Sequence, residues 1–152
     1  MGRKEKEIHD KEEIKDIIRG SEVCRLGFAV DNDPYIVPVS FGFDGEAIFF
    51  HTGSTGKKID CIRKNNSVCF ELEREVKVLP DEKSPCKWSF SFESVIGYGR
   101  IHELLEDAAK TCAMNHVMKQ YSGREWTFNE KTLIKTRVWK IEIDRLTGRK
   151  ST

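Results

Sequence analysis

The stretch YIVPVSFGFDGEAIFFHTGSTGKK, residues 35–58, decides the fold. Residues 35–43 are apolar and β-branched enough to predict a strand, and Asp44-Gly45 is a typical hairpin turn. Residues 46–52 form the returning strand, and a loop of four small residues then leads into a short helix at residues 57–64. A strand, hairpin, strand and short helix in this order indicate an antiparallel meander and not a βαβ unit.

The rest of the chain continues this pattern on both sides. Further strands are predicted at residues 23–30, 67–73, 88–104 and 137–143, and further helices at residues 10–20 and 106–121. Residues 76–87 contain two prolines and several charges, which predicts a long loop or hairpin tip, whereas residues 126–135 give no clear prediction. Gly97 and Gly99 would let their strand bend sharply, as a small barrel requires.

Length and composition narrow the class of protein. With 152 residues, a single domain over residues 1–152 is expected. The net charge of +1 argues against a general nucleic-acid binder, which would show a basic excess. The apolar runs are too short for a membrane span, and the charged N-terminus is unlike a secretory signal, so we expect a cytoplasmic protein without membrane attachment.

The cysteines and tryptophans carry little functional signal on their own. Five scattered cysteines without a CxxC pair are interpreted as reduced, buried thiols, in preference to a metal site or redox pair. The four histidines lack zinc-ligand spacing, so no metal is predicted. At least two of the tryptophans are expected in the core, although any could stack on a ring system. The tryptophans are Trp88, Trp126 and Trp139.

The loop at residues 53–56 has the composition of an anion site. Its two glycines allow close backbone approach, and Thr52, Ser54 and Thr55 offer hydroxyl groups. Lys57 and Lys58 open the following helix, where the helix dipole disfavours cations. A bound phosphate would offset that local conflict. A solvated loop followed by two exposed lysines explains the pattern equally well at this point.

Two neighbouring features could serve the same ligand. The apolar strand Ile36-Val37-Pro38-Val39-Ser40-Phe41 is a core strand whose interruption at Pro38 would also suit a planar ring lying against it. His51, at the end of the next strand, is interpreted either as a hydrogen-bonded structural residue or as a contact to a cofactor, a substrate or a haem iron.

Several motifs, taken in order, resemble the pyridoxamine 5′-phosphate oxidase-related flavoproteins, and within them the Nim-type nitroimidazole-resistance branch. They are YIVPVSF at 35–41, IFFHT at 48–52, GKKID at 56–60, SVCFE at 67–71 and SVIGYGR at 94–100. The resemblance covers about residues 10–150 and is most specific over residues 51–60. It implies a mainly β fold, a six-stranded antiparallel split β-barrel with short helices, assembled as a homodimer with FMN at the subunit interface.

The resemblance also assigns roles to individual residues. It implies that Thr52, Lys57 and Lys58 hold the FMN phosphate, that residues 36–41 line the flavin, and that Ser94 faces it. It links His51 to activity. Lys57 stands where the oxidases usually have an arginine, which keeps the charge but loses the bidentate fork. The oxidases' C-terminal Trp-and-Arg substrate signature is missing here, which argues against vitamin B6 oxidation.

Two functions follow as hypotheses. The first is an FMN-dependent oxidoreductase that reduces a small electron-poor substrate, such as a nitroheterocycle or a quinone, with electrons from an external reductant. The second is a non-catalytic protein that stores or senses flavin or haem on the same barrel. A purely structural dimer is disfavoured because it gives Lys57 and Lys58 no role.

Overall fold

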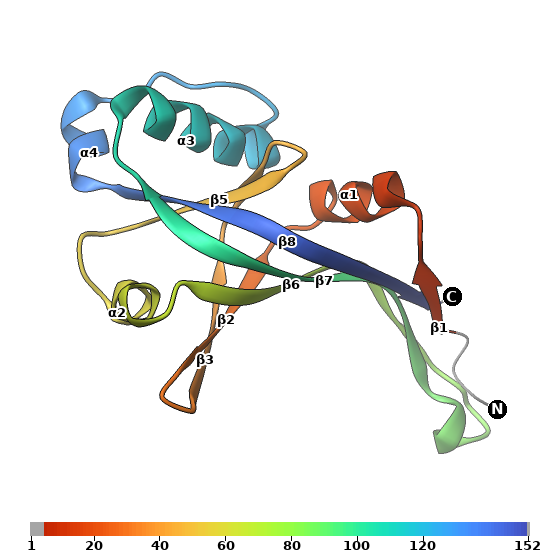
Figure 1. The fold of residues 1–152 in the computed structure, drawn as a ribbon. Coiled ribbons are helices and arrows are strands. Elements are labelled where there is room, and N and C mark those ends of the chain that lie inside the picture. The colour runs from red at the N-terminus through yellow and green to blue at the C-terminus, as the bar shows by residue number, and fades with distance from the viewer. Residues whose placement is uncertain (1–4, 152) are drawn as a thin grey trace.

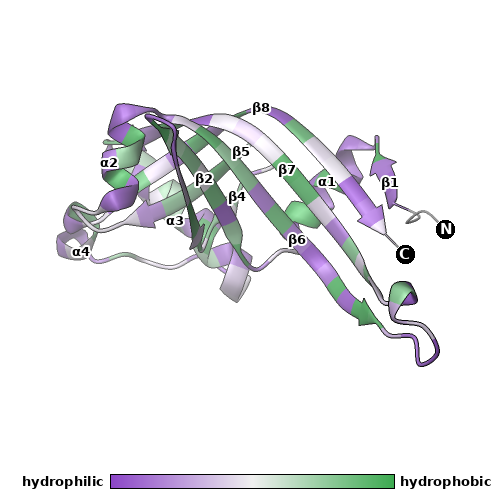
Figure 2. Ribbon diagram, turned by 90° about the horizontal axis from the view of Figure 1, so that it is seen from below, coloured by the Kyte–Doolittle hydropathy of each residue, from purple (hydrophilic) through white to green (hydrophobic). Residues whose placement is uncertain are grey.

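One antiparallel sheet organises residues 5–151, which are the residues that the computed structural model describes. Seven strands are hydrogen-bonded in the order β3-β2-β6-β7-β8-β5-β4, and β1 pairs with β8 beside this path. Apolar and polar residues alternate along the long strands, so one face of the curled sheet encloses the core (Figure 2). The strands are β1 (Glu5–Ile8), β2 (Cys24–Val30), β3 (Asp33–Val39), β4 (Gly42–Phe43), β5 (Ala47–Thr52), β6 (Ser67–Leu79), β7 (Ser89–Leu104) and β8 (Arg137–Ser151).

Most strand predictions are confirmed, with corrected boundaries. The predicted strand at residues 35–43 is divided into β3 and β4, because the chain leaves the β2 partner after Val39 and joins β5 at Gly42. The final strand runs to Ser151 instead of residue 143. Of the two alternatives predicted for residues 76–87, a long loop or a hairpin tip, the structure shows the hairpin tip: β6 and β7 continue as a hairpin that projects beyond the barrel (Figure 1).

In the described part of the chain, four α-helices flank the sheet. They are α1 (Lys11–Arg19), α2 (Lys57–Lys64), α3 (Asp107–Ser122) and α4 (Glu130–Lys135), and a 3₁₀ turn spans Pro85–Lys87. The Asp10 side chain accepts a hydrogen bond from the Glu12 N–H at 2.9 Å and caps α1. Helices α3 and α4 lie together on one side of the sheet, and α2 lies on the other side beside the β2–β3 hairpin (Figure 1).

The core consists of two clusters of buried side chains. The larger fills the barrel and includes Phe41, Phe50 and Phe70, while the smaller lies between β5 and α3 and includes Phe49 and Val117. Within residues 5–151, no helix is long and apolar enough to cross a bilayer.

Two sequence predictions about the core are wrong in part. Trp139 is buried, but Trp88 and Trp126 are 55% and 42% exposed, so only one tryptophan packs in the core. Cys24 and Cys61 are buried as predicted, whereas Cys86 and Cys112 are exposed. Tryptophan and cysteine side chains are usually buried, so a prediction from residue type alone assigns them to the core.

The β7–β8 ladder is irregular at Gly97 and Gly99, where the sequence predicted a bend. The register between β7 and β8 shifts between Tyr98 and Gly99. A Cβ atom on Gly97 would run into the ring of Phe70, and one on Gly99 would run into the carbonyl oxygen of Glu142. These two positions therefore have no room for a side chain where β7 crosses the barrel.

Candidate functional site

The loop at residues 53–56 connects β5 to α2 and leaves open space around its backbone. A Cβ atom added to Gly53 or Gly56 would meet no described atom within 4 Å. Gly56 is the N-cap residue of α2, has a φ of 144°, and provides no side-chain hydrogen bond to the first turn. The N–H groups of that turn are therefore left to an acceptor from outside the helix, which is the arrangement that suits an anion.

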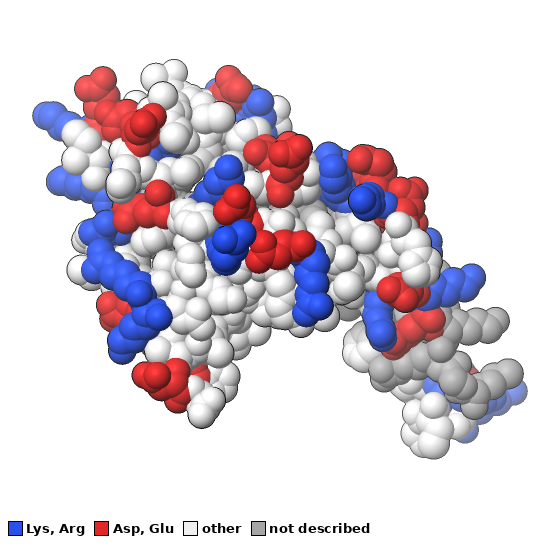
Figure 3. Space-filling view, viewed as in Figure 1, with Lys and Arg blue, Asp and Glu red and all other residues white. Residues whose placement is uncertain are grey.

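The two lysines of the first turn point to different neighbours. The ammonium group of Lys57 lies 4.4 Å from the centroid of the Tyr35 ring on β3, which links the loop to the strand predicted to line the flavin. Lys58 is half-buried and close enough to His51 for its charge to act on that ring. Figure 3 shows Lys and Arg side chains gathered over α2, and these cations would attract an anion.

Thr52 is buried beneath the loop, and its hydroxyl group is already engaged. It donates to the Gly53 carbonyl oxygen at 2.9 Å and accepts from the Trp139 indole N–H at 2.9 Å. In this arrangement Thr52 shapes the first residue of the loop. Its contact with a cofactor phosphate stays a prediction.

His51 lies on the opposite face of β5 from Phe50 and Thr52, next to Val138 of β8. Partial burial lowers the pKa of His51, and the charge of Lys58 lowers it further. Both effects favour the neutral imidazole near pH 7, which can accept a hydrogen bond at one nitrogen and donate at the other.

The strand predicted to line the flavin presents only half of its side chains to the outside. Ile36, Pro38 and Ser40 are exposed, whereas Val37, Val39 and Phe41 turn inward and pack on the barrel core. The Phe41 N–H is also occupied, because it donates to the Tyr121 hydroxyl at 3.1 Å. The inward residues can therefore meet a ligand only through their backbone.

Ser94 is a predicted site residue that the fold keeps apart from the loop within a single chain. It pairs with Glu73 and Arg149 near the start of β7, while the loop lies beside Glu103 near the end of that strand. At about 3.3 Å per residue, the strand from Ser94 to Glu103 is roughly 30 Å long. Ser94 can therefore reach such a site only from a second copy of the chain.

The structure adds two residues that sequence reasoning missed. Arg137, the first residue of β8, donates from Nε to the Ser54 carbonyl oxygen at 3.0 Å. Its Nη1 also donates to both carboxylate oxygens of Glu103, at 3.0 and 3.1 Å. Arg137 stands 83 residues from Ser54, and no local pattern marks so distant a partner.

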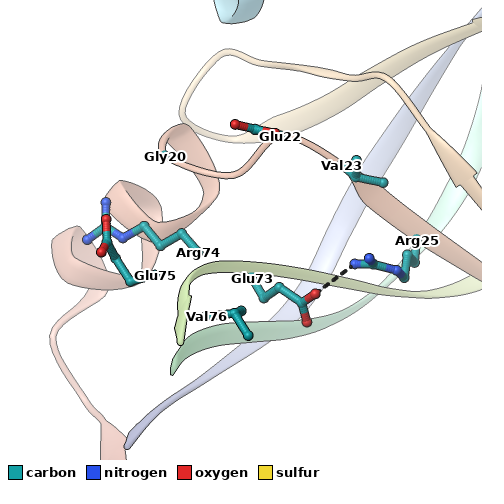
Figure 4. A pocket seen from close by; sticks show the side chains of 8 residues that line it. All are labelled: Gly20, Glu22, Val23, Arg25, Glu73, Arg74, Glu75 and Val76. Atoms are coloured by element: carbon teal, nitrogen blue, oxygen red, sulfur yellow. Dashed lines mark ion pairs between the residues drawn. The ribbon is translucent and has the colours of Figure 1, made fainter. Parts of the chain in front are cut away.

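A hollow of about 440 Å³ lies away from the loop, between the end of α1 and the β6 strand (Figure 4). Arg25 on β2 crosses its margin and forms ion pairs with Glu71 at 3.3 Å and Glu73 at 3.2 Å. Burial and, after it, the neighbouring Glu73 raise the pKa of Glu71 to about 7, although the charge of Arg25 opposes them. The Glu71 carboxyl thus holds its proton more tightly than a free glutamate does.

This raised pKa predicts a pH-dependent contribution to stability. The folded state binds a proton at Glu71 that the unfolded chain releases, so the contribution favours folding at low pH and is lost as the pH rises through about 7. Glu71→Gln should therefore raise the free energy of unfolding by about 1 kcal/mol at pH 8 and change it little at pH 5. Thermal unfolding at both pH values checks this, with the exposed Glu75→Gln as control. An unchanged pH dependence in Glu71→Gln would contradict it.

Comparisons with known proteins agree with this fold. Residues 10–150 match the family model described as pyridoxamine 5′-phosphate oxidase. A crystal structure of a candidate 5-nitroimidazole antibiotic resistance protein from Bacteroides thetaiotaomicron VPI-5482 is 27% identical, with a TM-score of 0.87 over 99% of this chain and 90% of that one. A FAD and heme binding protein from Mycobacterium smegmatis shares the fold at 16% identity, with a TM-score of 0.81 over 96% of this chain and 73% of that one.

A curated protein of Rhizobium meliloti (strain 1021) is 27% identical over 97 residues, which is 64% of this chain and 56% of that relative. The chain thus matches little more than half the length of this relative. The predicted mainly β antiparallel fold with short helices is confirmed, and it is the split barrel of these proteins. Because the family model spans almost all described residues, the chain belongs to the pyridoxamine 5′-phosphate oxidase family.

Proposed function

We propose that this chain is an FMN-dependent oxidoreductase that reduces a small electron-poor compound. The observation that carries the proposal is the open glycine loop before the uncapped N-terminus of α2, with Lys57 and Lys58 in its first turn. Backbone N–H donors and two cations are what a phosphate dianion requires. FMN carries such a phosphate at the end of its chain, and when bound it would supply the redox chemistry.

The residues around the loop suit the rest of that cofactor. Tyr35 and Lys57 connect the loop to β3, where Ile36 and Pro38, with Ser40 just beyond the strand, form an exposed and largely apolar strip. Among the described strands, β3 pairs only with β2 and lies at the edge of the sheet. The backbone of its unpaired edge is therefore free to meet the polar atoms of a flavin ring. These features support a flavin ring lying along β3 with its phosphate at α2.

A second copy of the chain would complete the site. Ile36, Gly27, Cys69 and Tyr98 form one cross-strand row on the outer face of β3, β2, β6 and β7. Ile36 is 67% exposed and Tyr98 is 39% exposed, and nearby Ile96 is 42% exposed. An apolar sheet face of this kind suits burial in an interface. A homodimer through this face would also bring β7 of the partner subunit, the strand that carries Ser94, toward the flavin.

His51 is the proposed contact above the ring. Its lowered pKa keeps the imidazole neutral at pH 7, so it can orient a substrate by hydrogen bonding without adding charge. A nitroheterocycle or a quinone would fit, and an external reductant would supply the electrons. The likeness to the candidate nitroimidazole resistance protein supports a nitro substrate.

The five unpaired cysteines accord with action in the cytoplasm, as one domain over residues 1–152.

An absorption spectrum of the purified protein tests the proposal most directly. We expect a yellow protein with flavin bands, FMN released on denaturation, and reduction of a nitroimidazole or quinone by the reduced form. A colourless protein that takes up no added FMN would refute the proposal. A Soret band on adding haemin that His51→Ala abolishes, with no turnover by the flavin form, would instead identify the non-catalytic storage or sensing function.

A further inference from the structure

The brace formed by Arg137 and Glu103 lies directly beside the proposed phosphate loop. Arg137 pairs with Thr52 in the β5–β8 ladder, so the guanidinium starts from the strand end where the loop begins. One side of the guanidinium holds the Ser54 carbonyl oxygen at 3.0 Å, and Nη1 reaches both oxygens of Glu103. The side chains of Arg137 and Glu103 are 32% and 24% exposed, so the pair is partly shielded from water.

This contact fixes the direction of a backbone donor. All peptide bonds in the described chain are trans, and in a trans peptide the carbonyl oxygen and the next N–H point to opposite sides. Holding the Ser54 oxygen at Arg137 therefore directs the Thr55 N–H away from β8. Thr52 acts in the same way one residue earlier, because its hydroxyl holds the Gly53 oxygen at 2.9 Å and so sets the Ser54 N–H.

The loop needs such a brace because its own sequence does not restrain it. Gly53 and Gly56 have open space around them and the widest backbone freedom. Donors that are held in place before the ligand arrives bind more tightly, because less ordering entropy is lost on binding. We propose that Arg137, held by Glu103, is a positioning residue that presets the Ser54–Thr55 peptide for the FMN phosphate, an inference that rests on the proposed function.

The ion pair of Arg137 with Glu103 lets two roles of Arg137 be told apart, which are positioning of the loop and direct attraction of the phosphate by charge. Glu103 balances the charge of Arg137, so the brace adds little net positive charge to the site. If Arg137 served the phosphate by charge, Glu103→Gln would free that charge and tighten FMN binding. If Arg137 acts by holding Ser54, Glu103→Gln loosens the guanidinium and weakens binding. A lysine at position 137 keeps the charge but lacks the planar fork that spans both partners.

The test compares dissociation constants for FMN and riboflavin, which differ by the phosphate, in the full chain. We expect Arg137→Gln and Arg137→Lys to weaken FMN binding about ten-fold, the loss of roughly one charged hydrogen bond. Riboflavin affinity should stay within about two-fold, and Glu103→Gln should weaken FMN binding in the same direction. Arg19→Gln, which breaks an ion pair with Asp16 on α1, serves as control.

The outcomes separate the two proposals. Wild-type protein that binds FMN no better than riboflavin would refute the phosphate site itself. If the wild type prefers FMN, an unchanged preference in Arg137→Gln, rescue by Arg137→Lys, or tighter FMN binding in Glu103→Gln would each overturn the positioning role. Circular dichroism confirms folding of each variant, and if Arg137→Gln does not fold, Glu103→Gln and Arg137→Lys still decide the matter.

Discussion

Replacing both lysines of the α2 first turn, Lys57→Ala/Lys58→Ala, is expected to weaken FMN binding by about 100-fold or more. Each charge-assisted contact to a phosphate contributes about 1.5–3 kcal/mol, and two such losses multiply in the dissociation constant. Riboflavin lacks the phosphate, so its affinity should change far less. Titration of the apoprotein by flavin fluorescence measures both constants.

The same substitution should hardly alter the stability of the apoprotein. Cations in the first turn oppose the helix dipole, so their removal relieves a few tenths of a kcal/mol. Loss of the Lys57 contact with the Tyr35 ring costs about 0.5–1 kcal/mol at an exposed site. These effects have opposite signs, and the free energy of unfolding should stay within about 1 kcal/mol of the wild type.

The matched control removes the same charge from the other end of the helix. Arg63 and Lys64 lie in the last turn of α2, about 10 Å from the loop at the usual helical rise. Arg63→Ala/Lys64→Ala should leave FMN affinity within a few-fold while lowering helix stability slightly. Equal loss of affinity in both double variants would mean that general charge, and not position, attracts the phosphate. Unchanged affinity in Lys57→Ala/Lys58→Ala would place the phosphate elsewhere.

A methyl group at Gly99 should destabilise the fold by about 3 kcal/mol or more. The added Cβ would run into the carbonyl oxygen of Glu142 and press on Ile141 of β8. A backbone oxygen cannot rotate aside as a flexible side chain can, so β7 and β8 would have to separate at the register shift. Chemical denaturation of Gly99→Ala measures the loss.

Gly53→Ala is the control for that variant, because a Cβ atom there meets no described atom within 4 Å. We expect a stability change within about 0.5 kcal/mol, as for most surface substitutions. If Gly99→Ala is as stable as Gly53→Ala, the close approach of β7 and β8 is not needed for folding.

The candidate site was predictable where its signal is local and unpredictable where it depends on distant partners. Lys57 and Lys58 stand out because charge and helix position conflict within a few residues. The contact of Lys57 with the Tyr35 ring and the effect of the Lys58 charge on His51 depend on how α2 packs. No sequence pattern marked Arg137 or Glu103 as a site residue. Each is an ordinary charged residue in the sequence, and only the pairing of β7 with β8 brings the two together.

The sequence by itself determined the strand and helix pattern, the Asp44-Gly45 hairpin and the loop chemistry at residues 53–58. These depend on side-chain period and turn residues, which act over short distances. Only the tertiary structure decided which side chains of β3 face outward, that Ser94 lies far from the loop, and that Thr52 and Arg137 hold its carbonyl groups. Those features depend on sheet register and strand order, which are set by contacts between residues far apart in the chain.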